Sequence, residues 1–121
     1  MAWKSLILCV DCVDDTPSLL EGQKMLLEEN GYRVLTATNG PDAVQVFVTH
    51  SVDLVILDYH MPGMNGAVAA ACMKNSRPEV PIMLVSGDED VPTSDLEAID
   101  CVLSKSGSIS SFLEKVDYPS A

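Results

Sequence analysis

Apolar runs rich in β-branched residues alternate with amphipathic stretches along the chain, and the alternation repeats five times. Parallel strands need long crossover connections, which are usually helices, so this order predicts an α/β fold with a parallel five-stranded sheet. The strands are expected at residues 6–10 or 6–13, 33–37, 53–57, 81–85 and 101–103. A length of 121 residues leaves room for one domain of ordinary size, residues 1–121.

Proline, glycine and cap residues predict where the helices begin and end. The expected helices begin at Thr16-Pro17 and stop at Gly31, begin at residues 39–42 and stop near His50, and span about 67–75 and 109–116. The acidic stretch 88–100 is weakly patterned and predicts at most a short helix at 94–99, a reduced fourth helix. Helical spacing predicts apolar inward faces at Leu19, Leu20, Gln23, Met25, Leu26, Leu27, Ala43, Val44, Phe47 and Val48.

The formal net charge is −11, from 18 acidic and 7 basic residues. Phosphate backbones and anionic membrane surfaces would repel such a chain, so we expect no nucleic-acid or membrane partner for this domain. The longest apolar runs fall well short of the ~18 residues of a membrane-spanning helix. The first residues also lack the pattern of a signal peptide, and a cytoplasmic protein is therefore expected.

Cys9 and Cys12 have the CxxC spacing of some zinc and redox motifs. No second pair follows at metal-binding distance, and residues i and i+3 of a strand point to opposite faces. We therefore expect buried structural cysteines here. The same segment contains a tandem tripeptide, Cys-Val-Asp at 9–11 and again at 12–14.

Polar side chains follow four of the five expected strands: Asp14-Asp15, Asp58, Ser86 and Lys105. In an open parallel sheet, ligands bind beyond the carboxyl ends of the strands. A turn, a cap or a surface charge would explain each residue alone. Their joint occurrence at one edge of the sheet favours a common site.

Crowded carboxylates need a cation, and Mg²⁺ binds through one or two carboxylates together with phosphate oxygens. A lysine and a hydroxyl could then hold the other oxygens of a phosphoryl group. Asp58, on the central strand, would be the nucleophile, because a carboxylate can form an acyl phosphate directly.

Residues 6–17, the segment Asp-Leu-Val-Ile-Leu-Asp-Tyr-His-Met-Pro-Gly-Met-Asn-Gly at 53–66, Val-Ser-Gly at 85–87 and Lys105 together resemble the receiver domain of two-component response regulators. The resemblance covers nearly the whole chain. It implies a flavodoxin-like (βα)₅, doubly wound sheet and Mg²⁺-dependent transfer of phosphate from the phosphohistidine of a histidine kinase or phosphotransfer protein to Asp58. It further implies signalling to a downstream protein, with the domain catalysing its own phosphorylation and dephosphorylation rather than acting as a conventional enzyme.

The resemblance also implies roles for individual residues. Asp15, Asp58 and the backbone carbonyl of His60 would bind the metal, and Asp14 would assist through water. Ser86 and Lys105 would contact the phosphoryl oxygens.

The tripeptide repeat departs from the family pattern, because deleting either copy leaves the usual sequence. If the second copy keeps the family register, Asp14-Asp15 is the acidic pair and Asp11 falls inside a buried strand, which is costly for a carboxylate. Alternatively, the strand ends at Val10, Asp11 is the first acidic residue and 12–14 bulge into the loop. Asp15 is an acidic residue of the expected metal site under either interpretation.

Two further departures concern the other end of the chain. Ser106 follows Lys105 where most relatives have proline after a typically cis bond, and Val102 occupies a position that is usually aromatic. These departures motivate an alternative function, a phosphorylation-independent interaction module. The sequence names neither the kinase nor the target, and leaves open whether an output domain follows residue 121.

Overall fold

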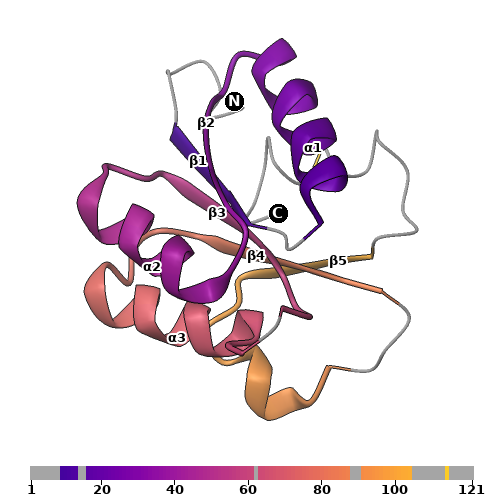
Figure 1. The fold of residues 1–121 in the computed structure, drawn as a ribbon. Coiled ribbons are helices and arrows are strands. Elements are labelled where there is room, and N and C mark those ends of the chain that lie inside the picture. The colour runs from indigo at the N-terminus through magenta and orange to yellow at the C-terminus, as the bar shows by residue number, and fades with distance from the viewer. Residues whose placement is uncertain (1–8, 14–15, 62, 88–90, 105–113, 115–121) are drawn as a thin grey trace.

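The computed structural model describes residues 9–13, 16–61, 63–87, 91–104 and 114. Its centre is a parallel five-stranded sheet with the strand order β2-β1-β3-β4-β5 (Figure 1). In chain order the elements are β1 (Cys9–Val13), α1 (Pro17–Glu29), β2 (Arg33–Ala37), α2 (Gly40–Thr49), β3 (Leu54–Asp58), α3 (Gly66–Ser76), β4 (Ile82–Ser86), the 3₁₀ helix η2 (Thr93–Leu96) and β5 (Cys101–Ser104). The predicted α/β fold and its doubly wound, flavodoxin-like architecture are confirmed.

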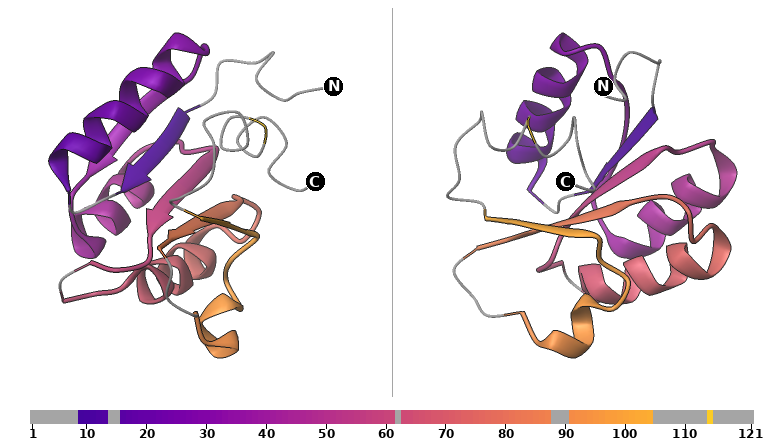
Figure 2. Two further views of the ribbon diagram at one scale, coloured as in Figure 1. Left: turned by 90° about the vertical axis from the view of Figure 1, so that its right-hand side faces the viewer. Right: turned by 180° about the vertical axis from the view of Figure 1, so that it is seen from behind.

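Helices cover both faces of this sheet (Figure 2). On one face, Leu20 and Leu27 of α1 pack with the strand residues Leu54, Ile56 and Met83. On the other face, α2 and α3 pack over the alternate strand residues, including Val55, Leu57, Ile82 and Leu84. The alternation of side chains along each strand thus supplies two apolar clusters from one sheet.

Local sequence signals set the helix boundaries. The Asn39 side chain accepts a hydrogen bond from the Asp42 N–H (2.8 Å) at the start of α2, and the Asn65 side chain accepts one from the Val68 N–H (3.1 Å) at the start of α3. These are N-caps, which satisfy amide groups that have no partner inside the helix. After α1, Gly31 adopts a φ of 92°, the left-handed conformation that ends many helices.

The fourth helix is reduced to η2, a single turn of four residues none of which is buried. This agrees with the weak pattern of the acidic stretch. The helix expected at 109–116 lies outside the described residues, apart from the helical Glu114.

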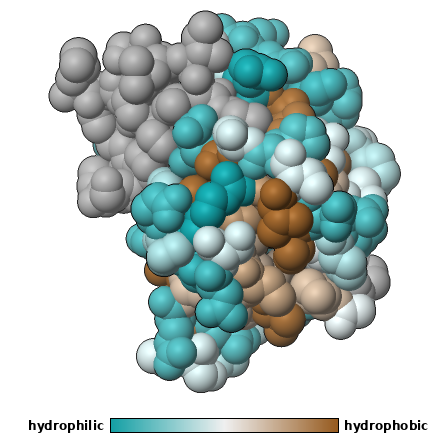
Figure 3. Space-filling view, turned by 90° about the vertical axis from the view of Figure 1, so that its left-hand side faces the viewer, coloured by the Kyte–Doolittle hydropathy of each residue, from teal (hydrophilic) through white to brown (hydrophobic). Residues whose placement is uncertain are grey.

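Three of the apolar side chains expected to point inward are exposed instead. Leu19 is 51% exposed, Met25 54% and Val48 50%. Apolar side chains also gather in a patch among hydrophilic ones on the face formed by α2 and α3 (Figure 3). Part of the apolar surface of α1, α2 and α3 is therefore covered neither by the sheet nor by a neighbouring helix.

Candidate functional site

The strand β1 runs without a bulge through residues 9–13, which include the whole first copy of the tripeptide and the first two residues of the second. Asp11 pairs in register with Leu35 on one side and Val55 on the other, and Val13 pairs with Ala37 and Leu57. The alternative in which the strand ends at Val10 is therefore wrong. Residues 14 and 15, which directly follow Val13 in the sequence, lie outside the described residues, as does Lys105.

Asp58 is the last residue of β3, and its side chain is only 3% exposed. It pairs with Val85 of β4, so it lies at the carboxyl edge of the sheet, as the sequence predicts. Asp58 takes part in interactions, but its buried Oδ1 atom accepts no hydrogen bond from the described part of the chain. A buried carboxylate at this edge is chemically unusual, because burial disfavours the charged form unless a cation or hydrogen bonds stabilise it.

The loop after β3 packs closely against Asp58. The Gly66 N–H donates to the Tyr59 carbonyl (2.9 Å), which brings the start of α3 over the end of β3. A Cβ atom on Gly66 would lie 2.6 Å from the Asp58 carbonyl oxygen and 2.9 Å from a methyl carbon of Leu84. Only glycine fits this approach, so the small residue here is a requirement of the site.

Ser86 occupies the same edge one strand further along. It is the last residue of β4, is 6% exposed and follows Val85, the partner of Asp58. Ser86 itself pairs with Ser104, the last residue of β5. Lys105 is the next residue in the sequence, and β3, β4 and β5 each end one residue later than expected.

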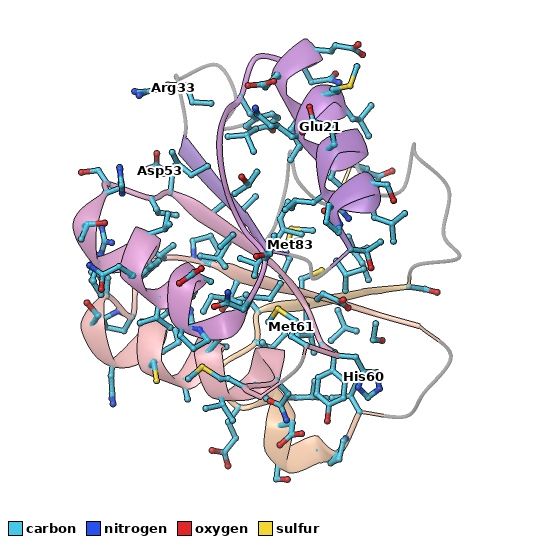
Figure 4. The ribbon with its side chains drawn as sticks, viewed as in Figure 1. Glu21, Arg33, Asp53, His60, Met61 and Met83 are labelled. Carbon is cyan, nitrogen blue, oxygen red and sulfur yellow. The ribbon has the colours of Figure 1, made fainter. Side chains whose placement is uncertain are left out.

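His60 follows β3, and its side chain is exposed (Figure 4). Its ring lies 5.1 Å from the ring of Tyr59, measured between centroids and tilted by 59°. The exposed imidazole makes His60 accessible at the edge of the site, whereas Tyr59 is buried (8% exposed).

No pattern in the sequence indicates a role for Tyr59 or Asp95, which the fold brings together. The Tyr59 hydroxyl donates a hydrogen bond of 2.6 Å to Oδ2 of Asp95, in η2. The two residues are 36 positions apart, and no pattern in the sequence relates them. The only available signal was a tyrosine directly after the expected acceptor Asp58.

The described residues contain no cluster of three His, Cys, Asp or Glu side chains that could bind a metal ion. They contribute one buried carboxylate, Asp58, to the expected metal site. The other two expected carboxylates, Asp14 and Asp15, lie outside them. Among the described helices, none is long and apolar enough to cross a membrane.

The fold and this edge define a class of protein, the doubly wound α/β domains that bind ligands beyond the carboxyl ends of their strands. Within that class, the chain belongs to the response regulator receiver domain family, whose model matches residues 10–117. The family functions in two-component phosphorelay signalling, and relatives of this chain include both response regulators and sensor kinases.

Curated relatives match this chain over part of their length. The probable transcriptional regulator ycf27 of Cyanidium caldarium is 40% identical over 86 residues, which are 70% of this chain and 32% of the relative. The regulatory protein GlrR of Escherichia coli is 32% identical over 103 residues, which are 85% of this chain and 22% of the relative. The sensor kinase/phosphatase LuxN of Vibrio harveyi is 40% identical over 76 residues, 63% of this chain and 9% of the relative. The chain therefore spans no more than about a third of these relatives.

Solved structures of receiver domains match nearly the whole chain. The response regulator TrrA of Thermotoga maritima, in complex with Mg²⁺-BeF, superposes with a TM-score of 0.84 at 33% identity and covers 91% of this chain and 96% of that one. A receiver domain from Clostridium thermocellum has a TM-score of 0.86 at 24% identity, with 94% of each chain covered. The second match supports the fold alone.

Proposed function

We propose that this domain accepts a phosphoryl group on Asp58 from the phosphohistidine of a histidine kinase or phosphotransfer protein. The observation that carries the proposal is the position of Asp58: it is a buried carboxylate at the carboxyl end of the central strand. A carboxylate oxygen of Asp58 would form a bond to phosphorus while the bond from phosphorus to the histidine nitrogen breaks. With a proton on the other ring nitrogen of the phosphohistidine, the electron pair of the broken bond stays on the departing nitrogen, and the products are an acyl phosphate and a neutral imidazole on the donor.

Mg²⁺ fits the chemistry of the donor set, because hard cations prefer carboxylate and carbonyl oxygens. We assign it to the carboxylates of Asp15 and Asp58 and the His60 carbonyl, with Asp14 assisting through water. The bound ion would neutralise part of the charge of these carboxylates and of the incoming phosphoryl oxygens. The Mg²⁺-BeF complex of the TrrA relative supports this assignment.

Ser86 and Lys105 would hold the phosphoryl oxygens opposite the metal. Ser86 is buried at the end of the strand next to β3, where its hydroxyl can serve a ligand bound at this edge. Lys105 follows the last residue of β5 and would supply a positive charge. Both would stabilise the transition state of the transfer, in which negative charge spreads over the outer oxygens of the phosphoryl group.

The natural partners under this proposal are a kinase or phosphotransfer protein upstream and a protein target downstream, in the cytoplasm. The net charge of −11 supports the expectation that this domain itself does not bind nucleic acid. A phosphorylation-independent interaction module would be indicated instead by a partner that binds equally well with and without phosphate on Asp58.

The experiment is to incubate the protein with acetyl phosphate and Mg²⁺ and to measure the intact mass. We expect the native protein to gain one phosphoryl group, and the gain to disappear in Asp58→Asn and after Mg²⁺ is chelated with EDTA. Asp53→Asn is the matched control, because Asp53 precedes the same strand at its other end. An adduct that persists in Asp58→Asn, or none on the native protein, contradicts the proposal.

A further inference from the structure

Tyr59 joins three elements around the peptide unit that follows Asp58. Its N–H donates to the Val85 carbonyl of β4 (2.9 Å), and its carbonyl accepts from the N–H of Gly66 at the start of α3 (2.9 Å). Its hydroxyl donates to the Asp95 carboxylate of η2 (2.6 Å). Backbone and side chain of one buried residue therefore connect the end of β3 with η2.

The segment that contains η2 has few other means of holding its position. Within the described chain, its own backbone bonds are short-range, from the Asp95 N–H to the Pro92 carbonyl and from the Ile99 N–H to the Leu96 carbonyl. The apolar residues that it packs on the core are only partly buried. A hydrogen bond from a buried tyrosine to a carboxylate is comparatively strong, because the acceptor is charged and water is largely excluded.

The other end of this connection has little freedom to move. The Asp58 carbonyl lies so close to Gly66 that even a methyl group would not fit between them. A change at the Asp58 side chain that displaces its peptide unit must therefore also displace Tyr59, which belongs to the same peptide unit. The phenol ring carries this displacement to Asp95.

We propose that Tyr59 is a positioning residue that couples the backbone at Asp58 to η2 through its hydrogen bond to Asp95. The inference rests on the proposed phosphorylation of Asp58. Coupling between two sites is reciprocal in free energy, so the anchoring of η2 alters phosphorylation, and phosphorylation alters the anchoring of η2. The segment 91–99 is then the part of this domain that reports the state of Asp58.

The first test measures amide hydrogen exchange in Tyr59→Phe, which keeps the ring and removes the hydroxyl. We expect the Asp95 and Ile99 amides to exchange roughly ten- to hundredfold faster, the range for the loss of a hydrogen bond to a charged group. The Asp100 amide is an internal control, because it donates to the Ile82 carbonyl of β4 and does not depend on η2. Unchanged exchange at Asp95 and Ile99 overturns the proposal.

Matched variants separate the hydrogen bond from general effects on the fold. Asp95→Ala should reproduce the effect of Tyr59→Phe, whereas Asp95→Asn keeps a neutral acceptor oxygen and should show a clearly smaller effect. Tyr32→Phe changes another buried tyrosine, which packs in the cluster beneath α1, and should leave η2 unaffected. If Asp95→Asn behaves like Asp95→Ala, the hydrogen bond is not the connection.

The second test measures the rate at which acetyl phosphate and Mg²⁺ phosphorylate each variant. Tyr59→Phe and Asp95→Ala should slow phosphorylation by a similar factor, roughly two- to tenfold. The double variant should be no slower than either single variant, because both remove the same interaction. In the native protein, phosphorylation should change the exchange of the Asp95 and Ile99 amides at least threefold, and this response should be lost in Tyr59→Phe.

The outcomes distinguish the two proposals. If the native protein gains no phosphoryl group, the proposed function and this inference both fail. If it does, but Tyr59→Phe is phosphorylated at the native rate and η2 exchange ignores phosphorylation, the inference fails and the proposed function stands.

Discussion

The strands β3 and β5 end at the same edge of the sheet but differ in burial. All five residues of β3 are buried, and so are all five of its neighbour β4. In β5, partly buried and exposed residues alternate, and Val102 is 46% exposed. β5 is less buried because it is an edge strand and because the helix that precedes it, which could cover it, is reduced to η2.

This difference in burial separates the proposed phosphorylation site from the region of η2 and β5. The proposed acceptor Asp58 and the hydroxyl of Ser86 lie on the two fully buried strands, where close packing limits their movement. The region of η2 and β5 has few buried apolar contacts, which is typical of segments that open at low free-energy cost. Mutations should therefore cost much in the first region and little in the second.

Leu84→Ala in β4 should have the largest effect. Leu84 is fully buried, so truncation removes apolar contacts and leaves a cavity, at a cost of about 2–5 kcal/mol in the free energy of unfolding. Urea denaturation measures this cost. A loss below about 1 kcal/mol would mean that the centre of the sheet is no more tightly packed than its edge.

Gly66→Ala should come next, at about 1–3 kcal/mol, because the added Cβ clashes with the Asp58 carbonyl and Leu84. The same variant should also slow phosphorylation, since it displaces the backbone of the acceptor. Gly22→Ala is the control: Gly22 lies in α1 with nothing within 4 Å of the added carbon, and the change should stabilise the protein by about 0.5–1 kcal/mol. Equal effects of the two variants would contradict the close approach at Gly66.

Asp100→Ala tests how β5 is attached at its other end. Oδ2 of Asp100 accepts hydrogen bonds from the Ile82 N–H (2.8 Å) and from Lys74 Nζ (2.7 Å), and we expect a loss of about 1–2 kcal/mol on its removal. Asp100→Asn keeps an acceptor for the Ile82 N–H and should lose less, and its loss should shrink in high salt because it removes only the ion pair with Lys74. Identical losses for the two variants would show that the ion pair contributes all of the effect.

Val102→Ala should have the smallest effect, within about 0.5 kcal/mol, because the side chain is nearly half exposed. Urea denaturation alongside Leu84→Ala makes the comparison direct. A loss above about 1.5 kcal/mol would show that β5 is packed more tightly than its exposure indicates.

Local patterns sufficed to predict most of the fold. Strand β2 was expected at its observed residues, and the signals at Pro17, Gly31 and Asn39 mark real helix ends, because each acts on its own neighbourhood. Exposure was harder to predict. Val48 has inward helical spacing, but whether a helix face is covered depends on neighbours that are distant in the sequence.

Part of the candidate site could be predicted from the sequence, and part could not. Asp58 and Ser86 were identified because parallel strands bring their carboxyl ends to one edge whatever their sequence distance. The contact between Tyr59 and Asp95 depends on the path of an irregular segment, for which no comparable rule exists. The sequence leaves two interpretations of the tripeptide repeat open, and the pairing of β1 with both neighbouring strands distinguishes them.

Because β1 pairs with its neighbours over residues 9–13, deletion of the first copy of the repeat would change the sequence of an interior strand. Removal of residues 9–11 leaves the second copy next to the same neighbours and moves Leu8 to the position that Asp11 holds between β2 and β3. For the sheet, this deletion thus replaces Cys-Val-Asp with Leu-Ile-Leu and removes one charged residue from an interior strand. We therefore expect the chain that lacks residues 9–11 to be at least as stable to urea as the native chain, because an interior strand loses a charged residue.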